Sequence, residues 1–304
     1  MDKNGCYTKN DTDKCEVLND FFSSVFTKED DNNIPNFVYD GEIPNSLSNC
    51  NVSINDFEKA LLNLKPNKSP GPDSFHPKFF KLCSKSLALP LKLLFDLTLL
   101  EGALPMEWKT AEVRPIYKKG DKSNPGNYRP VSLTSIVCKL FESFIKKALN
   151  EHFINNNILS NHQFGFVSGR STITQLLVTL NDWLFSLDND VPIDAAYMDF
   201  RKAFDTVPHL RLINKLKGYN IKGPILQWIK SFLSDRTQFV KINNSCSKRL
   251  DVTSGVPQGS VLGPTLFIYF INDLPNSAIN TPMKIFADDT KVYKSIESEN
   301  DVKQ

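Results

Sequence analysis

Two groups of acidic residues in this chain have the type and setting that phosphoryl-transfer chemistry needs. Asp288 and Asp289 are adjacent, and within residues 283–293 they separate two short, partly alternating apolar runs with the spacing of a β-hairpin. Asp199 follows a third apolar run, residues 191–198. A strand end beside a hairpin tip would bring the three carboxylates to one point, where two Mg²⁺ ions about 3.5–4 Å apart could clamp an in-line displacement. An isolated Asp-Asp pair is more often a solvated turn, so other segments must decide.

The sequence between the two acidic groups contains a loop that suits a nucleotide. Residues 254–264 read Ser-Gly-Val-Pro-Gln-Gly-Ser-Val-Leu-Gly-Pro. Three glycines let the backbone approach a ligand closely, two prolines stiffen the loop, and Gln258 offers a hydrogen-bond donor and acceptors without charge. These properties favour a nucleotide over a metal ion as the ligand of this loop.

The elements that would position these residues follow from hydrophobic spacing and turn signals. Expected strands cover residues 113–117, 128–133, 191–198, 237–242 and 249–253, together with the hairpin at 283–293. Expected helices cover residues 53–64, 90–100, 137–148, 173–187 and 224–233. The apolar stripes at 137–148 and 173–187 predict helix faces that belong to the core.

Several blocks, in a fixed order, carry a family resemblance. The blocks nearest the acids are DFRKAFDTV at 199–207, SGVPQGSVLGPTLFIYFINDLP at 254–275 and FADDT at 286–290. Further blocks lie at 68–73, 108–121, 127–133 and 163–172. Together they resemble the reverse transcriptases of non-LTR (LINE-type) retrotransposons, closest to the jockey-like group.

The resemblance implies an α+β fold of the right-hand polymerase type, with fingers and palm present and the thumb absent. The implied boundaries are fingers at roughly 108–171 and 207–260 and palm at roughly 172–206 and 261–304. Residues 53–107 are interpreted as a helical N-terminal extension of the fingers. Residues 1–52 are acidic and are expected to be partly disordered, except for a short docked helix at 20–26. We expect a truncated piece of a longer protein that binds primer-template weakly and extends it little or not at all.

The resemblance also assigns roles residue by residue. Asp199, Asp288 and Asp289 are expected to be the catalytic carboxylates and to hold two Mg²⁺ ions, for which Mn²⁺ is a substitute. The residues expected to bind the substrate are Lys118, Arg129, Phe204, Gln258 and Gly259. The two basic residues would grip the triphosphate, and the aromatic ring would exclude a 2′-hydroxyl. Gln258 and Gly259 would line the nucleotide and the template base.

Each of these residues also has a plainer interpretation. Basic side chains are more often solvated surface charges, and Phe204, one of 22 phenylalanines, could equally be a core residue. Lys119 is an alternative to Lys118, because alignments with the family slip at this point. Asp205 is interpreted as a helix cap, since a proline follows three residues later. Val167 stands where the family usually has a basic residue, so one contact with template or primer is not expected here.

The resemblance implies an RNA-directed DNA polymerase that adds dNTPs to a primer 3′-hydroxyl. Its partners would be an RNA template, above all the RNA of its own element, a DNA primer or target, and dNTPs. A two-metal nuclease of the RNase H type is a second interpretation, which the 254–264 loop disfavours because a nuclease needs no surface for a dNTP. A degenerate fragment that binds RNA or primer-template without polymerising is a third, and it stays open.

Composition agrees with a nucleic-acid-binding protein of the cell interior. Residues 1–60 hold five Lys and Arg against twelve Asp and Glu, whereas the remaining residues hold 31 against 22. Such a basic body suits binding to a phosphate backbone, and charge alone fits an ordinary solvated surface equally well. The N-terminus is polar, and the longest apolar stretch, residues 261–271, is too short and too interrupted to span a membrane. The six cysteines show no paired metal-ligand spacing, so we expect an intracellular protein, in the nucleus and cytoplasm, without a membrane partner.

Overall fold

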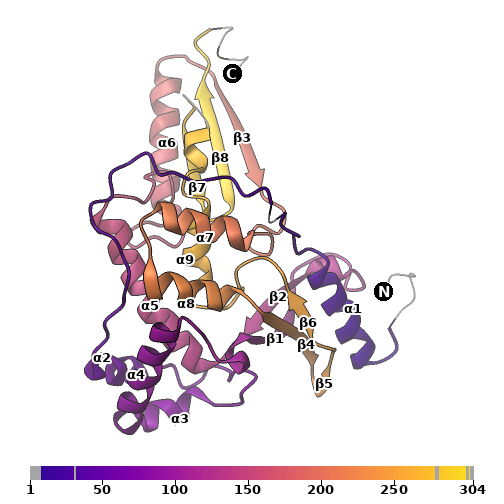
Figure 1. Cartoon of the computed structure of the whole chain (residues 1–304). Helices are drawn as coiled ribbons and strands as arrows, with labels where there is room; N and C mark the ends of the chain where they lie inside the picture. The colour runs from indigo at the N-terminus through magenta and orange to yellow at the C-terminus, as the bar shows by residue number, and fades with distance from the viewer. Residues whose placement is uncertain (1–7, 31, 278–280, 299–300, 302–304) are drawn as a thin grey trace.

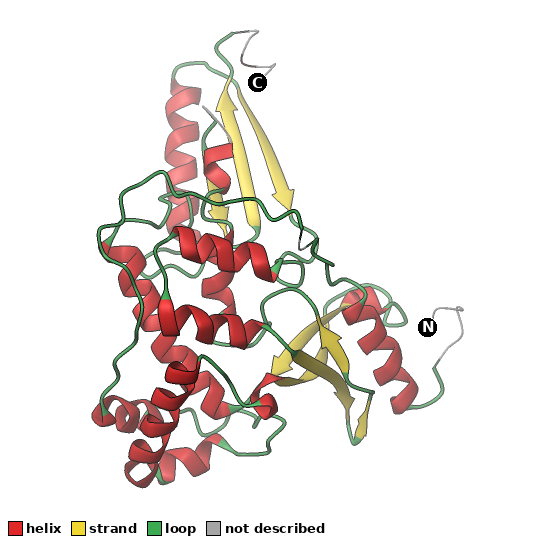
Figure 2. Cartoon of the chain, in the orientation of Figure 1, coloured by secondary structure: helices red, strands yellow, loops and turns green. Residues whose placement is uncertain are grey.

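The computed structural model describes residues 8–30, 32–277, 281–298 and 301. Its helices and strands are mixed along the chain, as the expected α+β class requires (Figure 2). The α-helices are α1 (Asp11–Ser23), α2 (Ile54–Leu62), α3 (Pro77–Leu82), α4 (Ser84–Glu101), α5 (Ile136–Asn155), α6 (Thr172–Asp188), α7 (His209–Gly218), α8 (Gly223–Leu233) and α9 (Gly263–Phe270). Short 3₁₀ turns are η1 (Met106–Lys109), η2 (Pro125–Asn127) and η3 (Leu274–Ser277). The strands are β1 (Thr110–Tyr117), β2 (Tyr128–Leu133), β3 (Ile193–Asp199), β4 (Arg236–Ile242), β5 (Ser245–Cys246), β6 (Leu250–Val252), β7 (Met283–Phe286) and β8 (Asp289–Ser295).

The strands form two separate sheets (Figure 1). The five-stranded sheet has the order β2-β1-β4-β5, with β6 also paired to β4. Strands β1 and β2 form an antiparallel hairpin, whereas β1 and β4 run parallel from the pair Thr110 and Thr237. The three-stranded sheet has the order β3-β8-β7 and is antiparallel throughout. The expected strands and the pairing of β4 with β6 are therefore confirmed, while the parallel β1–β4 pair was not expected.

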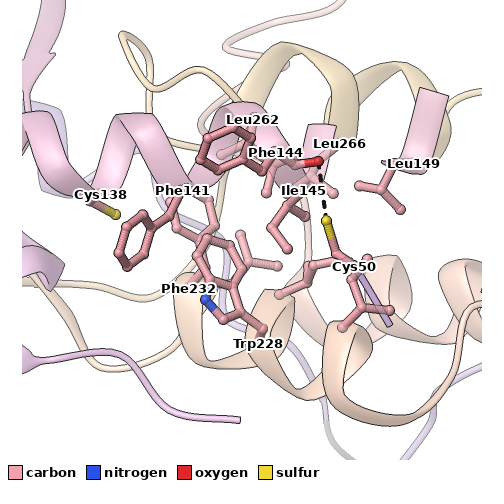
Figure 3. Packing of buried hydrophobic residues seen from close by; sticks show 14 of the residues in the cluster. Cys50, Cys138, Phe141, Phe144, Ile145, Leu149, Trp228, Phe232, Leu262 and Leu266 are labelled. Atoms are coloured by element: carbon pink, nitrogen blue, oxygen red, sulfur yellow. Dashed lines mark hydrogen bonds between the residues drawn. The ribbon is translucent and has the colours of Figure 1, made fainter. Parts of the chain in front are cut away.

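Six helices build the main hydrophobic core of the described residues. Helices α2, α4, α5, α7, α8 and α9 contribute large side chains that are almost fully buried. Figure 3 shows Phe141 and Phe144 of α5 in the same buried cluster as Trp228 and Phe232 of α8. The rings of Phe57 and Phe141 meet edge to face, with centroids 6.0 Å apart, a geometry that aromatic pairs prefer. This packing holds the segments that lead into both sheets. Within the described residues, we find no helix whose length and apolar character would let it cross a lipid bilayer.

The N-terminal segment contains a longer helix than the one expected at residues 20–26. Helix α1 runs from Asp11 to Ser23, whereas only residues 20–26 were expected to be helical. Its buried apolar residues pack with Val113 of β1 and Val240 of β4; they are Cys15, Leu18 and Phe22. The apolar side chains at this helical spacing were hidden by the polar residues around them. Asn19 adds hydrogen bonds to the Lys248 carbonyl and from the Gln238 amide.

Two other helices depart from the expected pattern. Helix α4 begins at Ser84, so Pro90 lies inside it, although a helix was expected to start at that proline. It ends as expected at Gly102, whose φ is +61°. In α6, the apolar stripe predicted to be core is exposed in the structure. The side chain of Ile173 at its start is 67% exposed, and that of Leu187 at its end is 59% exposed. Helix α6 instead turns Gln175, Thr179 and other polar side chains inward, so that prediction was wrong.

Candidate active site

One cavity of about 780 Å³ is lined by five distant segments of the chain, one of which contributes only Phe166. The other four are the β1–β2 hairpin, the end of β3 with the segment after it, the loop before α9 and the β7–β8 turn. All eight site residues expected from the sequence line it: Lys118, Arg129, Asp199, Phe204, Gln258, Gly259, Asp288 and Asp289. Lys119 does not line it. A second cavity of about 810 Å³, between α1 and the five-stranded sheet, contains none of these residues. Both volumes lie in the range of small-molecule sites, but the expected chemistry is confined to the first.

The three carboxylates lie at adjoining ends of strands. Asp199 ends β3 and is the register partner of Asp289, the first residue of β8. Asp288 occupies the β7–β8 turn beside Ala287, whose φ is +57°. Partial burial raises the pKa of Asp288, and the negative charges of Asp289 and Asp199 raise it further. The three acids are therefore close enough to repel one another.

The donor chemistry of these acids fits hard divalent cations, because Mg²⁺ prefers carboxylate oxygens. Among the described residues, however, no three His, Cys, Asp or Glu side chains are already drawn together as a set of metal ligands.

A buried glutamine holds the acidic turn from behind, and sequence reasoning did not identify it. The Gln163 side-chain oxygen accepts hydrogen bonds from the backbone N–H groups of Gly165 at 2.8 Å and Ala287 at 3.0 Å. The Phe164 N–H donates to the Ile285 carbonyl at 2.8 Å, so the two segments run side by side. A Cβ atom on Gly165 would lie 2.4 Å from the Ala287 nitrogen, which explains why only glycine fits there. The glycine in this block was the available sequence signal.

Two basic residues line the same cavity as the acids. Lys118 follows β1 and Arg129 lies in β2, so the hairpin presents both. Burial lowers the pKa of Lys118, as do the charges of Arg129 and Lys202, while Asp199 and Asp288 act in the opposite direction. Lys202 also lines the cavity and was not expected from the sequence. This side of the cavity is electropositive and suits an anionic group.

The ring of Phe204 belongs partly to the core and partly to the cavity. It stacks on Phe267 of α9, with ring centroids 4.2 Å apart and an interplanar angle of 17°. It also meets the edge of Phe166 at 6.3 Å. Because Phe204 is half-buried and lines the cavity, its plain interpretation as a core residue and its interpretation as a sugar contact are compatible.

The loop before α9 is tied to β2 at one end and to α5 at the other. The Ser132 N–H of β2 donates to the Gln258 carbonyl at 2.7 Å, and a Cβ on Gly259 would lie 2.4 Å from the Ser132 oxygen. Gly259 also has a φ of +115°, which L side chains rarely adopt. The far end of the loop is held by Glu142, a fully buried carboxylate that accepts from the N–H groups of Val261 and Leu262. Burial raises the pKa of Glu142.

Asp205 does not cap a helix. Helix α7 begins four residues later, after Pro208, and has no side-chain cap. The Asp205 carboxylate instead accepts a hydrogen bond of 2.7 Å from the Gln258 side-chain amide. The expectation of a cap was wrong because spacing to a proline cannot reveal a contact with a residue 53 positions away.

Comparisons with known proteins show the family of this chain. Residues 116–304 match the family model described as reverse transcriptase (RNA-dependent DNA polymerase). The chain is 36% identical over 232 residues to the probable RNA-directed DNA polymerase from transposon BS of Drosophila melanogaster, covering 74% of this chain and 25% of that protein. It is 31% identical over 261 residues to the RNA-directed DNA polymerase from mobile element jockey of the same species, covering 83% and 28%.

A further similarity extends over nearly the whole chain. The probable RNA-directed DNA polymerase from transposon X-element of Drosophila melanogaster is 28% identical over 306 residues, covering 97% of this chain and 34% of that protein. The chain thus spans about a quarter to a third of the length of these relatives. It belongs to the reverse transcriptase (RNA-dependent DNA polymerase) family, among the polymerases of non-LTR retrotransposons.

Proposed function

We propose that the 780 Å³ cavity is the nucleotidyl-transfer site of an RNA-directed DNA polymerase. The observation that carries this proposal is the convergence of all eight expected residues, from four segments, on one cavity. In this proposal the three-stranded sheet with α6 and α9 belongs to the palm, and the five-stranded sheet belongs to the fingers. The partners would be an RNA template, such as that of the parent element, a DNA primer and dNTPs.

The three carboxylates would hold the metal ions that the reaction needs. Asp199 and Asp288 would bind two Mg²⁺ ions, with Asp289 as the third carboxylate of the set. Bound there, the ions supply activation of the primer 3′-hydroxyl and neutralise charge on the leaving pyrophosphate. The chain's own contribution is to keep the three carboxylates at strand ends that are fixed by the β3–β8 register.

The remaining lining residues would position the nucleotide. Lys118 offers a point charge and Arg129 a planar fork, which together suit a triphosphate. The Phe204 ring would lie against the sugar and exclude a 2′-hydroxyl by steric overlap. Gln258 and Gly259 would line the base of the nucleotide and the template.

The proposal is tested by nucleotide addition under single-turnover conditions. The 304-residue chain, in excess over a poly(rA)/oligo(dT) primer-template, is mixed with dTTP, with and without Mg²⁺ or Mn²⁺. We expect slow addition that requires the divalent ion and is lost in Asp199→Asn and in Asp288→Asn. Asp251→Asn, on the exposed face of β6, is the matched control and should keep the wild-type rate.

Two outcomes would oppose the proposal. Addition that persists in both aspartate variants would rule out the carboxylates as the catalytic centre. Binding of primer-template without any addition, with either ion, would favour the alternative in which this chain binds nucleic acid but does not polymerise. Filter binding of the same primer-template separates that alternative from a chain that simply fails to bind.

A further inference from the structure

Two loops of the cavity are fastened to each other by a short series of hydrogen bonds. The Val256 N–H donates to the Phe204 carbonyl and the Gly255 N–H to the Val207 carbonyl, both at 2.8 Å. At the centre of this series, the Asp205 backbone carbonyl accepts from the Ser254 hydroxyl at 2.7 Å. The segment after β3 and the loop before α9 therefore form one unit, with Asp205 in the middle.

The side chain of Asp205 adds a contact of a different kind. Its Oδ1 atom accepts from the Gln258 Nε2 atom at 2.7 Å, and both residues line the cavity. Within the described residues, Asp205 forms no ion pair with a neighbouring cation. Burial raises the pKa of Asp205, while Gln258, Lys202 and Lys118 act to lower it. Among the described residues, the side-chain partner of the Asp205 carboxylate is thus the Gln258 amide and not a basic residue.

This contact fixes which end of the Gln258 amide faces the ligand. The Asp205 Oδ1 atom is the acceptor of this hydrogen bond, so the atom that meets it is the amide nitrogen, which donates. The two ends of an amide have nearly the same shape, and only the hydrogen-bond network decides between them. With the nitrogen engaged by Asp205, the oxygen is the end left to accept a hydrogen bond in the cavity.

We propose that Asp205 is a positioning residue that orients the Gln258 amide, so that its oxygen accepts a hydrogen bond from the incoming nucleotide. Asp205 itself does not touch the nucleotide or the catalytic acids in this account. The identity of the ligand rests on the proposed function, whereas the orientation of the amide does not. Two measurements separate these parts.

The first measurement is nuclear magnetic resonance of the side-chain amides after labelling with ¹⁵N-glutamine. The chain has six glutamines, and Gln258→Ala assigns the pair of resonances that belongs to Gln258. In Asp205→Asn the new side chain can donate or accept, so both amide orientations become available. We expect the Gln258 pair to shift or split while the other glutamine pairs stay in place. Asp205→Ala, which removes the acceptor, should shift the same pair, and Asp251→Asn should shift none.

If the amide resonances of Gln258 do not shift in either Asp205 variant, Asp205 does not orient the Gln258 amide. A general shift of all glutamine pairs would also overturn the orientation, because that would mean that Asp205 serves the fold as a whole. Neither result depends on polymerase activity. Titration of dTTP with Mg²⁺ into the labelled wild-type chain should move the Gln258 pair, and a pair that stays fixed would contradict its contact with the nucleotide.

The second measurement is the kinetics of single-nucleotide addition. Asp205→Asn should raise the KM for dTTP about three- to tenfold, the effect of losing one oriented hydrogen bond, with kcat changed less than about twofold. In a Gln258→Ala background, the same substitution should change KM less than about twofold, because its target is gone. Full additivity of the two substitutions would show that Asp205 does not act through Gln258. If the wild-type chain adds no nucleotide, the proposed function fails, and the resonance shifts alone decide the orientation.

Discussion

The charge of Asp288 is the residue-level feature that most directly links this fold to its chemistry. Burial and the neighbouring charges of Asp289 and Asp199 raise its pKa, so ionised Asp288 is unfavourable in the metal-free protein. A carboxyl group whose pKa is higher in the folded than in the unfolded state stabilises the fold when protonated. That stabilisation is complete below the usual pKa of aspartate, near 4, and is lost as the pH rises through the raised pKa.

Asp288→Asn should therefore have a higher thermal midpoint than the wild type at pH 8 without divalent ions. The difference should shrink as the pH falls toward 4, because wild-type Asp288 then becomes neutral too. Thermal unfolding between pH 4 and 8 measures this directly, with Asp251→Asn as the control. Excess Mg²⁺ should reverse the order by stabilising only the wild type. A variant that is less stable than the wild type at pH 8 without metal would contradict the repulsion.

Phe204 gives a second residue-level prediction, about the sugar of the nucleotide. Phe204→Ala should raise the incorporation of ribonucleotides relative to deoxyribonucleotides, because removing the ring opens the volume that a 2′-hydroxyl needs. The measurement is the ratio of kcat/KM for UTP and dTTP in wild type and variant. Phe166→Ala is the control, since that exposed ring also lines the cavity. An unchanged ratio in Phe204→Ala would mean that Phe204 only packs against Phe267 and does not select the sugar.

At the scale of elements, the β7–β8 turn depends on a segment that lies far from it in sequence. The oxygen of Gln163 accepts from the Ala287 N–H, and no local turn residue replaces that contact. Gln163→Ala should therefore speed hydrogen exchange of the amides at 286–289 by about fivefold, the effect of losing about one hydrogen bond. Gln227→Ala, an exposed glutamine on α8, is the control. Equal hydrogen-exchange rates at these amides in Gln163→Ala and wild type would show that the turn is stable without the Gln163 contact.

The exposed apolar stripe of helix α6, which the sequence predicted to be core, can be tested by substitution. Its apolar stripe is exposed, while Asp182 accepts from the Tyr293 hydroxyl and Ser186 lies 2.6 Å from Ser295 of β8. Leu177→Gln should change the free energy of unfolding by less than about 0.5 kcal/mol, as at other exposed positions. Leu149→Ala, at a fully buried site in α5, should cost about 2–5 kcal/mol. Denaturant unfolding compares the two, and similar losses would mean that the α6 stripe is buried after all.

These elements also show what the sequence can and cannot reveal. Hydrophobic spacing predicts that α5 and α6 are helices with an apolar stripe, because that pattern is local. It cannot predict whether another element covers the stripe. The stripe of α5 is buried, whereas that of α6 is exposed. The bounds of β2 and the hairpin at 283–293 were predictable from turn signals, whereas the role of Gln163 needs a contact across 124 positions.

At the scale of the whole molecule, the candidate site exists only because distant segments are brought together. The parallel pairing of β1 with β4 and the packing of α1 on the same sheet join residues more than 100 positions apart. Family resemblance identifies the lining residues, since their types and order are preserved in the sequence. It does not identify Asp205, Gln163 or Glu142 as supports, because each acts through hydrogen bonds that only the folded chain creates.

Iron-mediated cleavage of the chain can show whether Asp199, Asp288 and Asp289 form one ion-holding centre. Fe²⁺ binds carboxylate sites in place of Mg²⁺, and with ascorbate and peroxide it cuts the backbone close to where it is bound. We predict cuts near residues 198–205 and 286–290 in the wild-type protein, competed by excess Mg²⁺ and absent from Asp199→Asn and Asp288→Asn. Cuts at other places, or cuts at these places that persist in both variants, would contradict the account.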